Sequence, residues 1–313
     1  MSAVATRPRL GFLGVGWIGR HRLERIEASG LAEVAAIADP AEEHALGSLD
    51  ELLEHELDGV VIATPSALHA EQAVAALEHG LAVFCQKPLG RTAAEAARIV
   101  RAARKADRLL GVDLSYRRLD GAARIRELVR SGELGEIRAA ELVFHNAYGP
   151  DKAWFYDPEL SGGGCLIDLG IHLVDLAFWT LGWPRVEHAE GRLLGEPVED
   201  YAVAQLELAS GAVVRLACSW NLPVGQDAVI EAGFYGRDGG ASVRNVGGSF
   251  YDFVAERFRG RERETLAEPP DDWFGRAAVE WARRLAEGDR YDAEVERSVD
   301  VMEVLDAIYG RGS

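Results

Sequence analysis

Two aspartates and a histidine interrupt the apolar segment at residues 162–179, which reads GGGCLIDLGIHLVDLAFW. On a helix with 3.6 residues per turn, the spacing i, i+4, i+7 and i+11 places four side chains on one narrow stripe. The other positions are apolar, which is typical of a helix enclosed by protein on nearly all sides. Ionisable groups there are costly unless they are paired, hydrogen-bonded or exposed to a cavity. The stripe contains Asp168, His172, Asp175 and Trp179.

Two interpretations of this stripe are compatible with the spacing. Asp168 and His172 are close enough along a helix to satisfy each other as a buried pair with no further role. Alternatively, they form an acid/base pair that opens onto a cleft between domains and moves a proton. Asp175 is expected to be structural. A metal site is not expected, because no neighbouring cysteine or histidine cluster supplies further ligands.

The elements that must position these groups begin with an alternation of strands and helices over the first 115 residues. The strands are short apolar runs bounded by Gly, Pro or Asp, and the segments between them have helical patterns. This order predicts an α/β fold with a doubly wound parallel sheet and right-handed crossovers. The expected strands are 9–14, 33–39, 59–64, 81–86 and 109–115, and the expected helices are 18–30, 70–80 and 92–107.

A glycine motif follows the first expected strand and directly precedes a helix. Its GxGxxG spacing predicts a dinucleotide site, because the glycines allow a tight turn, close approach of backbone to a pyrophosphate, and close packing of helix on strand. The helix N-terminus offers free N–H groups to the anion. The expected cofactor contacts here are Gly14, Gly16, Trp17, Ile18 and Gly19.

The second expected strand ends at Asp39, where a carboxylate can accept hydrogen bonds from both hydroxyls of an adenosine ribose. Glu42 and Glu43 follow, and no Arg or Lys stands close by in the sequence. A 2'-phosphate would therefore meet negative charge. The sequence predicts NAD rather than NADP as the cofactor.

Polar residues also follow the third and fourth expected strands. In a doubly wound sheet, ligands bind beyond the carboxyl ends of the strands. Lys87 is expected beside the nicotinamide half of the cofactor, a position that favours a functional role over that of a lysine merely solvated at a strand end. The residues expected at this edge are Thr64, Pro65, His69, Gln86 and Lys87.

From about residue 136 the apolar runs are longer and partly alternate with polar residues. They predict an α+β domain with a large, open, mostly antiparallel sheet, interrupted by a helix at 165–181. Two helices, near 271–287 and 293–309, finish the chain. We expect a Rossmann domain at residues 1–118 and a substrate and oligomerisation domain at 119–313, whose last helix could pack back on the first domain.

The loop at residues 146–164 concentrates aromatic side chains, including Tyr148 and Trp154. Aromatic faces pack against the C–H surfaces of sugars, although core packing would explain some of these residues. No Lys/Arg cluster suited to a phosphate stands out. A neutral pyranose or cyclitol is therefore expected as substrate.

The chain has 51 acidic and 34 basic residues and a formal charge of −17, which disfavours nucleic acid and anionic membranes as partners. Its three cysteines are widely spaced and indicate neither a disulfide framework nor a zinc motif. No signal peptide pattern and no run of about 18 apolar residues stands out. We therefore expect a cytoplasmic protein.

Taken in order, the motifs GVGWIG, ATPSALH, QKPLG, SGELGEI and GGGCLIDLGIHLVDLAFWTLG resemble the Gfo/Idh/MocA family of nicotinamide-dependent sugar and cyclitol oxidoreductases. The resemblance implies a homodimer or homotetramer formed through the exposed sheet face of the second domain. It also implies a catalytic set of Lys87, Asp168 and His172, with Arg117 or Arg118 near the substrate. In that set His172 would transfer the proton, Asp168 would orient the His172 imidazole, and Lys87 would stabilise a developing alkoxide.

One residue departs from the family pattern, because Gln86 stands where the family usually has glutamate. The change removes a negative charge beside Lys87, and we expect it to be neutral for the reaction. Two other functions remain compatible with the sequence. They are a non-catalytic NAD-binding regulator and a relative that uses NAD transiently in a redox-neutral step such as glycoside cleavage.

Overall fold

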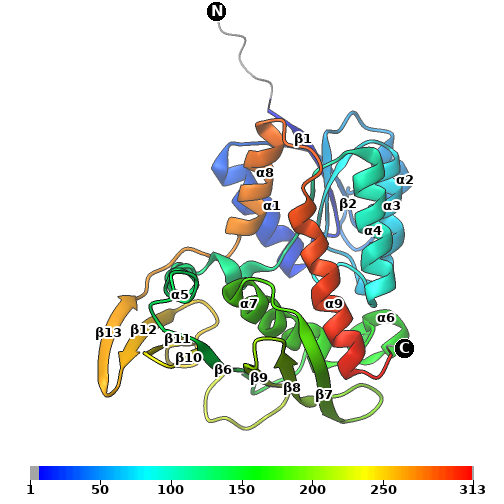
Figure 1. Cartoon of the computed structure of the whole chain (residues 1–313). Coiled ribbons are helices and arrows are strands. Elements are labelled where there is room, and N and C mark those ends of the chain that lie inside the picture. Colours follow the sequence, from blue (N-terminus) through cyan, green and yellow to red (C-terminus); the bar gives the residue numbers. More distant parts are fainter. Residues whose placement is uncertain (1–6, 312–313) are drawn as a thin grey trace, which may run out of the picture. The chain divides into compact units, whose positions relative to one another are not determined.

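The computed structural model describes residues 7–311 and contains two compact units (Figure 1). The first unit is built from the chain up to Leu114 together with Gly275–Val299. The second is built from Ser115–Phe274 together with the chain from Asp300 onward. Each unit has a sheet of its own.

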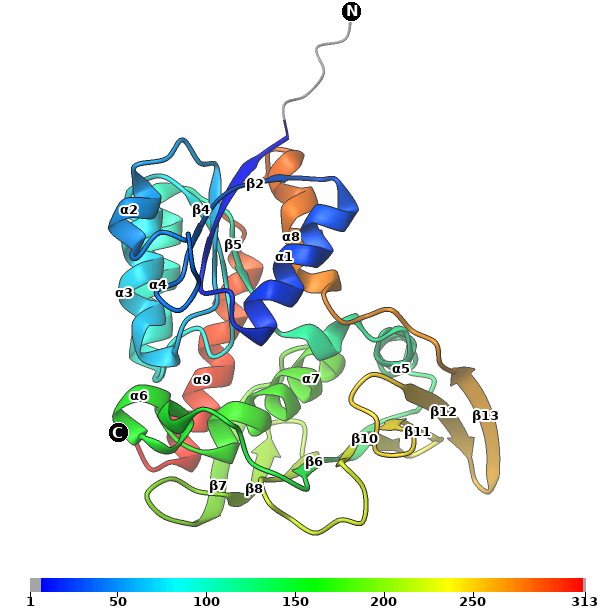
Figure 2. The same ribbon diagram turned by 180° about the vertical axis from the view of Figure 1, so that it is seen from behind.

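The first unit contains a five-stranded parallel sheet, which confirms the predicted fold class. Its strand order is β2-β1-β3-β4-β5, so the connections reverse direction between β1 and β3, which is where ligands bind in such sheets. Figure 2 shows α1 and α8 on one face and α2, α3 and α4 on the other. The strands are β1 (Arg9–Leu13), β2 (Glu33–Ala38), β3 (Gly59–Ile62), β4 (Ala82–Cys85) and β5 (Leu110–Val112), and the helices are α1 (Trp17–Ser29), α2 (Leu49–Leu53), α3 (Ser66–Glu78), α4 (Ala93–Ala106) and α8 (Arg276–Ala286).

The helix α8 comes from late in the chain and completes the core of the first unit. Trp281 packs against Phe84 of β4 with ring centroids 5.7 Å apart. Two strand glycines make room for it, because a Cβ on Gly111 would lie 2.8 Å from the Trp281 ring and one on Gly59 would lie 3.0 Å from it. The core of this unit therefore depends on a segment translated after residue 274.

The second unit contains an eight-stranded sheet in the order β13-β12-β11-β10-β6-β9-β8-β7. The central pair β6–β9 is parallel, and the other pairs of this sheet are antiparallel. The prediction of a large, mostly antiparallel sheet is therefore confirmed. The strands are β6 (Ile137–Asn146), β7 (Val186–Leu194), β8 (Tyr201–Leu208), β9 (Val213–Ser219), β10 (Ala228–Gly236), β11 (Gly240–Asn245), β12 (Phe253–Arg259) and β13 (Glu262–Ala267).

The hairpin β12–β13 was not among the predicted strands. Its sequence is rich in Arg and Glu, and the first four residues of β13 are exposed. Charged side chains are common on edge strands, where they prevent pairing with other chains, and they hide the alternation on which strand prediction depends.

One face of the large sheet is covered by α5 (Asp120–Arg130) and α7 (Ile171–Leu181). Residues 166–170 form a single wide π-helical turn, η3 (Leu166–Gly170), directly before α7. Among the described residues one segment, Pro158–Leu181, is long and apolar enough to cross a membrane, but 78% of its most apolar window is buried, as in the core helix of a soluble protein. The remaining elements are η1 (Ser115–Arg118), η2 (Ala153–Tyr156), α6 (Pro158–Ser161), η4 (Ala293–Glu296) and α9 (Arg297–Ile308).

Candidate functional site

The glycine turn of the first unit has the geometry that its motif predicts. Gly14 has φ +86°, and a Cβ there would lie 2.7 Å from the Ala63 carbonyl oxygen. A Cβ on Gly19 would collide with the Gly14 carbonyl, so close packing of helix on strand requires glycine. Around Gly16, by contrast, a Cβ would meet no atom within 4 Å.

The open space at Gly16 lies at the N-terminus of α1. The helix begins at Trp17, and no side chain caps it at Gly16 within the described part of the chain. Trp17 is 70% exposed, and Ile18 is half-buried. A helix N-terminus without a side-chain cap, beside unfilled space, is what a pyrophosphate needs, so these residues fit a dinucleotide.

Asp39 links the end of β2 to this turn. Its Oδ2 accepts a hydrogen bond from the Val15 amide at 2.8 Å, and its Oδ1 accepts one from the Ala41 amide at 2.9 Å. A carboxylate has about four acceptor positions, so both oxygens keep capacity for ribose hydroxyls. No Arg or Lys is close to Asp39 in the sequence, but the fold brings in Arg20 of α1, which forms an ion pair with Glu42 at 2.5 Å.

His69 of α3 connects the chain segments that follow β3 and β4. Its Nδ1 lies 2.7 Å from the Pro88 carbonyl oxygen, and its Nε2 lies 2.8 Å from that of Thr64. Burial lowers the pKa of His69, and the two carbonyl contacts oppose that shift. The neutral imidazole has one N–H and donates to one of these two carbonyl oxygens, and its ring lies between Thr64 and Pro88 at one edge of the sheet. Pro65 precedes α3, and Lys87 is half-buried at the end of β4.

A buried charged network lies directly before Lys87. Arg22 of α1 donates from Nε to Asp113 Oδ2 at 2.6 Å, and both side chains are almost fully buried. The Gln86 amide donates to the same Asp113 oxygen. Because it joins α1 to the ends of β4 and β5, this network sets the backbone from which Lys87 projects.

In the second unit, Asp168 and His172 are both half-buried. The Trp220 indole N–H donates to Asp168 Oδ2 at 3.1 Å. The His172 ring lies 5.0 Å from the Tyr116 ring, measured between centroids, and 6.4 Å from that of Phe144. Burial and the Asp168 charge raise the pKa of Tyr116, so its hydroxyl stays protonated.

Asp175 and Arg117 form a separate ion pair one helical turn further on. Arg117 donates from Nε to Asp175 Oδ2 at 2.7 Å and from Nη2 to the other carboxylate oxygen. Its guanidinium also lies 4.9 Å over the Trp183 ring. Asp175 is 1% exposed, and the positive charge of Arg117 offsets the desolvation of its carboxylate.

The aromatic loop divides into packed and exposed members. Trp154 stacks on Phe155 at 3.8 Å between ring centroids, and Phe155 meets the edge of Trp220 at 6.3 Å. Tyr148 is 51% exposed and lies 6.2 Å from Phe250. Trp154 is therefore connected through one ring, that of Phe155, to the indole that binds Asp168, and Tyr148 presents an open aromatic surface.

Sequence reasoning missed two residues that contact this candidate site, Tyr116 and Trp220. Tyr116 precedes an arginine pair in η1, and Trp220 directly follows β9; each is an aromatic side chain with a polar group, a residue type that usually hydrogen-bonds when buried. Within residues 7–311 no group of three or more His, Cys, Asp or Glu residues is arranged to hold a metal.

Both halves of the chain match family models. Residues 8–114 match the oxidoreductase family with an NAD-binding Rossmann fold, and residues 122–242 match the GFO/IDH/MocA C-terminal domain. A relative named D-xylose 1-dehydrogenase (NADP(+)) 2, from Haloferax volcanii, is 30% identical over 319 residues, covering 96% of this chain and 95% of that protein. The chain belongs to the Gfo/Idh/MocA family. The resemblance expected from the motifs is thereby confirmed.

Two further proteins are similar to this chain over different lengths. D-glucoside 3-dehydrogenase of Escherichia coli is 31% identical over 211 residues, which is 61% of this chain and 60% of that enzyme. The crystal structure of an aldose-aldose oxidoreductase from Caulobacter crescentus complexed with glycerol covers 97% of each chain with a TM-score of 0.86 and 20% identity. At that identity the similarity establishes a shared fold.

Proposed function

We propose that this protein is an NAD-dependent dehydrogenase that oxidises a hydroxyl of a neutral sugar or cyclitol, or reduces the corresponding ketone. Family membership supports oxidoreductase chemistry, and the open space at Gly16 beside the uncapped N-terminus of α1 supports dinucleotide binding. The observation that carries the proposal is that Asp168 and His172, one turn apart, are both half-buried in a mostly apolar helical segment. When bound, the nicotinamide accepts or gives the hydride.

His172 is proposed as the group that takes the hydroxyl proton during oxidation and returns it during reduction. An imidazole suits this role because its ordinary pKa lies near neutrality. Asp168, whose carboxylate is held by Trp220, would orient His172 or the substrate. Lys87 would stabilise the developing alkoxide with its positive charge.

The substrate contacts are proposed on the second unit. Tyr148 and Trp154 would pack against the C–H face of a sugar or cyclitol. Arg117 is held by Asp175 and its side chain is 16% exposed, so it would contact the substrate only through that remaining edge. Residues 1–118 are proposed as the cofactor domain and 119–313 as the substrate and oligomerisation domain, except that Gly275–Val299 belongs to the first compact unit.

The assay that tests the function follows absorbance of reduced nicotinamide with a panel of inositols, aldoses and their keto forms. Reduction of NAD by at least one polyol, in proportion to product formed, is the expected result. Product without net reduced cofactor would instead favour a redox-neutral reaction. Binding of NAD with no turnover of any polyol or keto form would contradict the proposal.

NAD is proposed over NADP because the carboxylate of Asp39 follows β2, two further acidic residues, Glu42 and Glu43, stand on the same loop, and Glu42 is paired with Arg20. Replacing Asp39 with alanine removes a charged acceptor and a source of repulsion toward a 2'-phosphate. We expect the ratio of NADP to NAD affinity to rise by roughly 10- to 100-fold, as for the loss of one charged hydrogen bond. Titration of each cofactor against the variant measures the ratio.

Glu43→Ala is the matched control, because the Glu43 side chain is 90% exposed on the same loop. It should leave the cofactor ratio nearly unchanged. Tighter binding of NADP than NAD by the unmodified protein would overturn the assignment.

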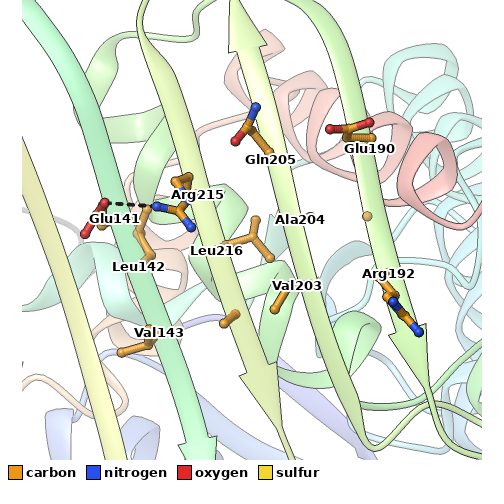
Figure 3. A pocket seen from close by; sticks show the side chains of 12 residues that line it. Glu141, Leu142, Val143, Glu190, Arg192, Val203, Ala204, Gln205, Arg215 and Leu216 are labelled. Atoms are coloured by element: carbon orange, nitrogen blue, oxygen red, sulfur yellow. Dashed lines mark ion pairs between the residues drawn. The ribbon is translucent and has the colours of Figure 1, made fainter.

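A homodimer or homotetramer is proposed through the uncovered face of the large sheet. Figure 3 shows this face, where β6, β9, β8 and β7 present a shallow hollow with charges of both signs. Glu141 and Arg215 form an ion pair there at 3.7 Å, and Val203 is 37% exposed. A surface with both signs and an apolar centre can be complementary to a second copy of itself.

Replacing Val203 with arginine adds a charge at the centre of this face. We expect the variant to dissociate to a smaller species at micromolar concentration, because a buried unpaired charge costs several kcal/mol, of order 3. Light scattering on eluted fractions measures the mass. Val246→Arg is the control, since Val246 is an equally exposed valine outside these strands at 42%. A monomeric unmodified protein, or an unaffected V203R variant, would contradict this surface.

A cytoplasmic location is proposed. The three cysteines at positions 85, 165 and 218 are all free and buried, which suits a reducing compartment.

A further inference from the structure

The helix that carries Asp168 and His172 begins with backbone donors that need partners from elsewhere. The first N–H groups of any helix have no carbonyl within the helix to bond. Here the first amide with a carbonyl partner inside the helix is that of Asp168, which donates to the Gly164 carbonyl oxygen at 3.1 Å. The four preceding donors are the amides of Gly164, Cys165, Leu166 and Ile167.

All four donors are taken up by two residues that are distant in sequence. Glu199 Oε1 accepts from the amides of Gly164 and Leu166, both at 2.9 Å, and the Glu199 carbonyl oxygen accepts from that of Cys165 at 2.8 Å. The Ile167 amide donates to the Tyr309 hydroxyl oxygen at 3.2 Å. That hydroxyl in turn donates to Glu199 Oε1 at 2.6 Å.

The glycine run before the helix is required by the same two residues. A Cβ on Gly163 would collide with the Tyr309 hydroxyl, and one on Gly164 would collide with the Glu199 backbone. Arg311 adds a third connection, because it donates to the Gly162 carbonyl oxygen at 2.7 Å and lies 4.0 Å over the Tyr309 ring. The end of α9 is therefore fastened to the start of the catalytic segment.

The environment keeps Tyr309 able to donate its proton. Burial and the neighbouring Glu199 raise the pKa of the Tyr309 phenol well above its ordinary value. Glu199 itself is only 6% exposed, so each hydrogen bond to its carboxylate is protected from water.

We propose that Glu199 and Tyr309 are positioning residues. They fix the turn that contains Asp168 and that leads directly into the helix with His172, the two residues proposed to act in proton transfer. The role rests on the proposed function of those two residues. Asp168 directly follows the four anchored amides and lies in the wide π-turn, a geometry that the local sequence does not favour by itself. A displacement of about 1 Å at a reacting group can cost up to about 10²-fold in rate.

Tyr309→Phe tests the proposal with a change that removes one oxygen. It should lower kcat about 10-fold or more with the polyol substrate, while the KM for that substrate and the affinity for NAD change by less than about threefold. Tyr291→Phe is the matched control, because Tyr291 also donates to a glutamate, Glu296 at 2.5 Å, but lies in the first unit. This control should keep kcat within about twofold of the unmodified protein.

Amide hydrogen exchange of residues 164–168 supplies a measurement that does not depend on activity. In Y309F these amides should exchange about 10-fold faster or more, as loss of one anchoring bond predicts. If the unmodified protein oxidises no polyol, the proposed function fails, and the exchange rates still decide whether Tyr309 holds this turn.

Three results would overturn the positioning role. One is an unchanged kcat in Y309F, even with a lower melting temperature, which would leave Tyr309 merely structural. Another is a lower kcat without faster exchange at 164–168. The third is an equal loss of kcat in the Y291F control.

Discussion

Replacement of His172 by alanine is expected to lower kcat by about 10²–10⁴-fold, the range found when a general acid or base is removed. The affinity for NAD should stay unchanged, because the glycine turn and Asp39 belong to the first unit. The variant should also lose the part of the pH–rate profile that reports ionisation of this imidazole. Steady-state kinetics between pH 5 and 9, together with a cofactor titration, measure all three quantities.

His145→Ala is a matched control for that experiment. His145 is also a half-buried histidine of the second unit, and its Nδ1 lies 2.8 Å from the Ser219 hydroxyl oxygen on β9. It has no role in the proposed reaction, so its kcat should stay within about threefold of the unmodified protein. A turnover rate in H172A equal to that of the unmodified protein would refute the assignment of the proton-transferring group.

Replacement of Arg22 by methionine is expected to destabilise the protein by about 3–5 kcal/mol, the cost of removing one partner of a buried ion pair. Asp113 would keep its charge in a site where it is 2% exposed, and the Gln86 amide, a neutral donor, would replace no part of the lost positive charge. Methionine preserves most of the buried aliphatic volume, so a cavity contributes little. Denaturant unfolding of the first unit measures the change in free energy.

Arg20→Met provides the comparison on the same helix. Arg20 forms its ion pair with Glu42 at the surface, where both side chains are more than 40% exposed, so its loss should cost no more than about 1 kcal/mol. Equal unfolding free energies for the R20M and R22M variants would show that burial of the Arg22–Asp113 pair has no energetic consequence.

The same network gives Gln86 a physical role. Its amide donates a proton to Asp113, which a glutamate in ionised form could not do. Two carboxylates against one arginine would repel each other in this buried site. The glutamine is therefore complementary to Asp113, which directly follows β5.

The local signals of the sequence predict the first sheet and its glycine turn well. Gly14 and Gly19 are constrained by atoms within the same strand-turn-helix unit or the next strand, and the five strands are continuous apolar runs. Such features need only a few neighbouring residues, so periodicity and turn chemistry are sufficient to find them.

The candidate site of the second unit is less accessible to such reasoning. The helical wheel groups Asp175 with Asp168, but Asp175 binds Arg117, 58 residues earlier, and Asp168 binds Trp220, 52 residues later. The π-turn also departs from the 3.6-residue period on which the wheel depends. Pairings between such distant residues follow from the tertiary fold and leave no local pattern.

The late contribution of α8 to the first core has a consequence for biosynthesis. Leu10, Phe12 and Phe84 form a sheet face that Trp281 covers, and all of Ser115–Phe274 is synthesised before that tryptophan. Synthesis proceeds at roughly 5–20 residues per second, so this apolar face stays exposed while the strands of the second sheet are synthesised. Nascent chains stalled before residue 275 should therefore recruit chaperones, and a fragment cut at the end of β5 should aggregate when expressed alone.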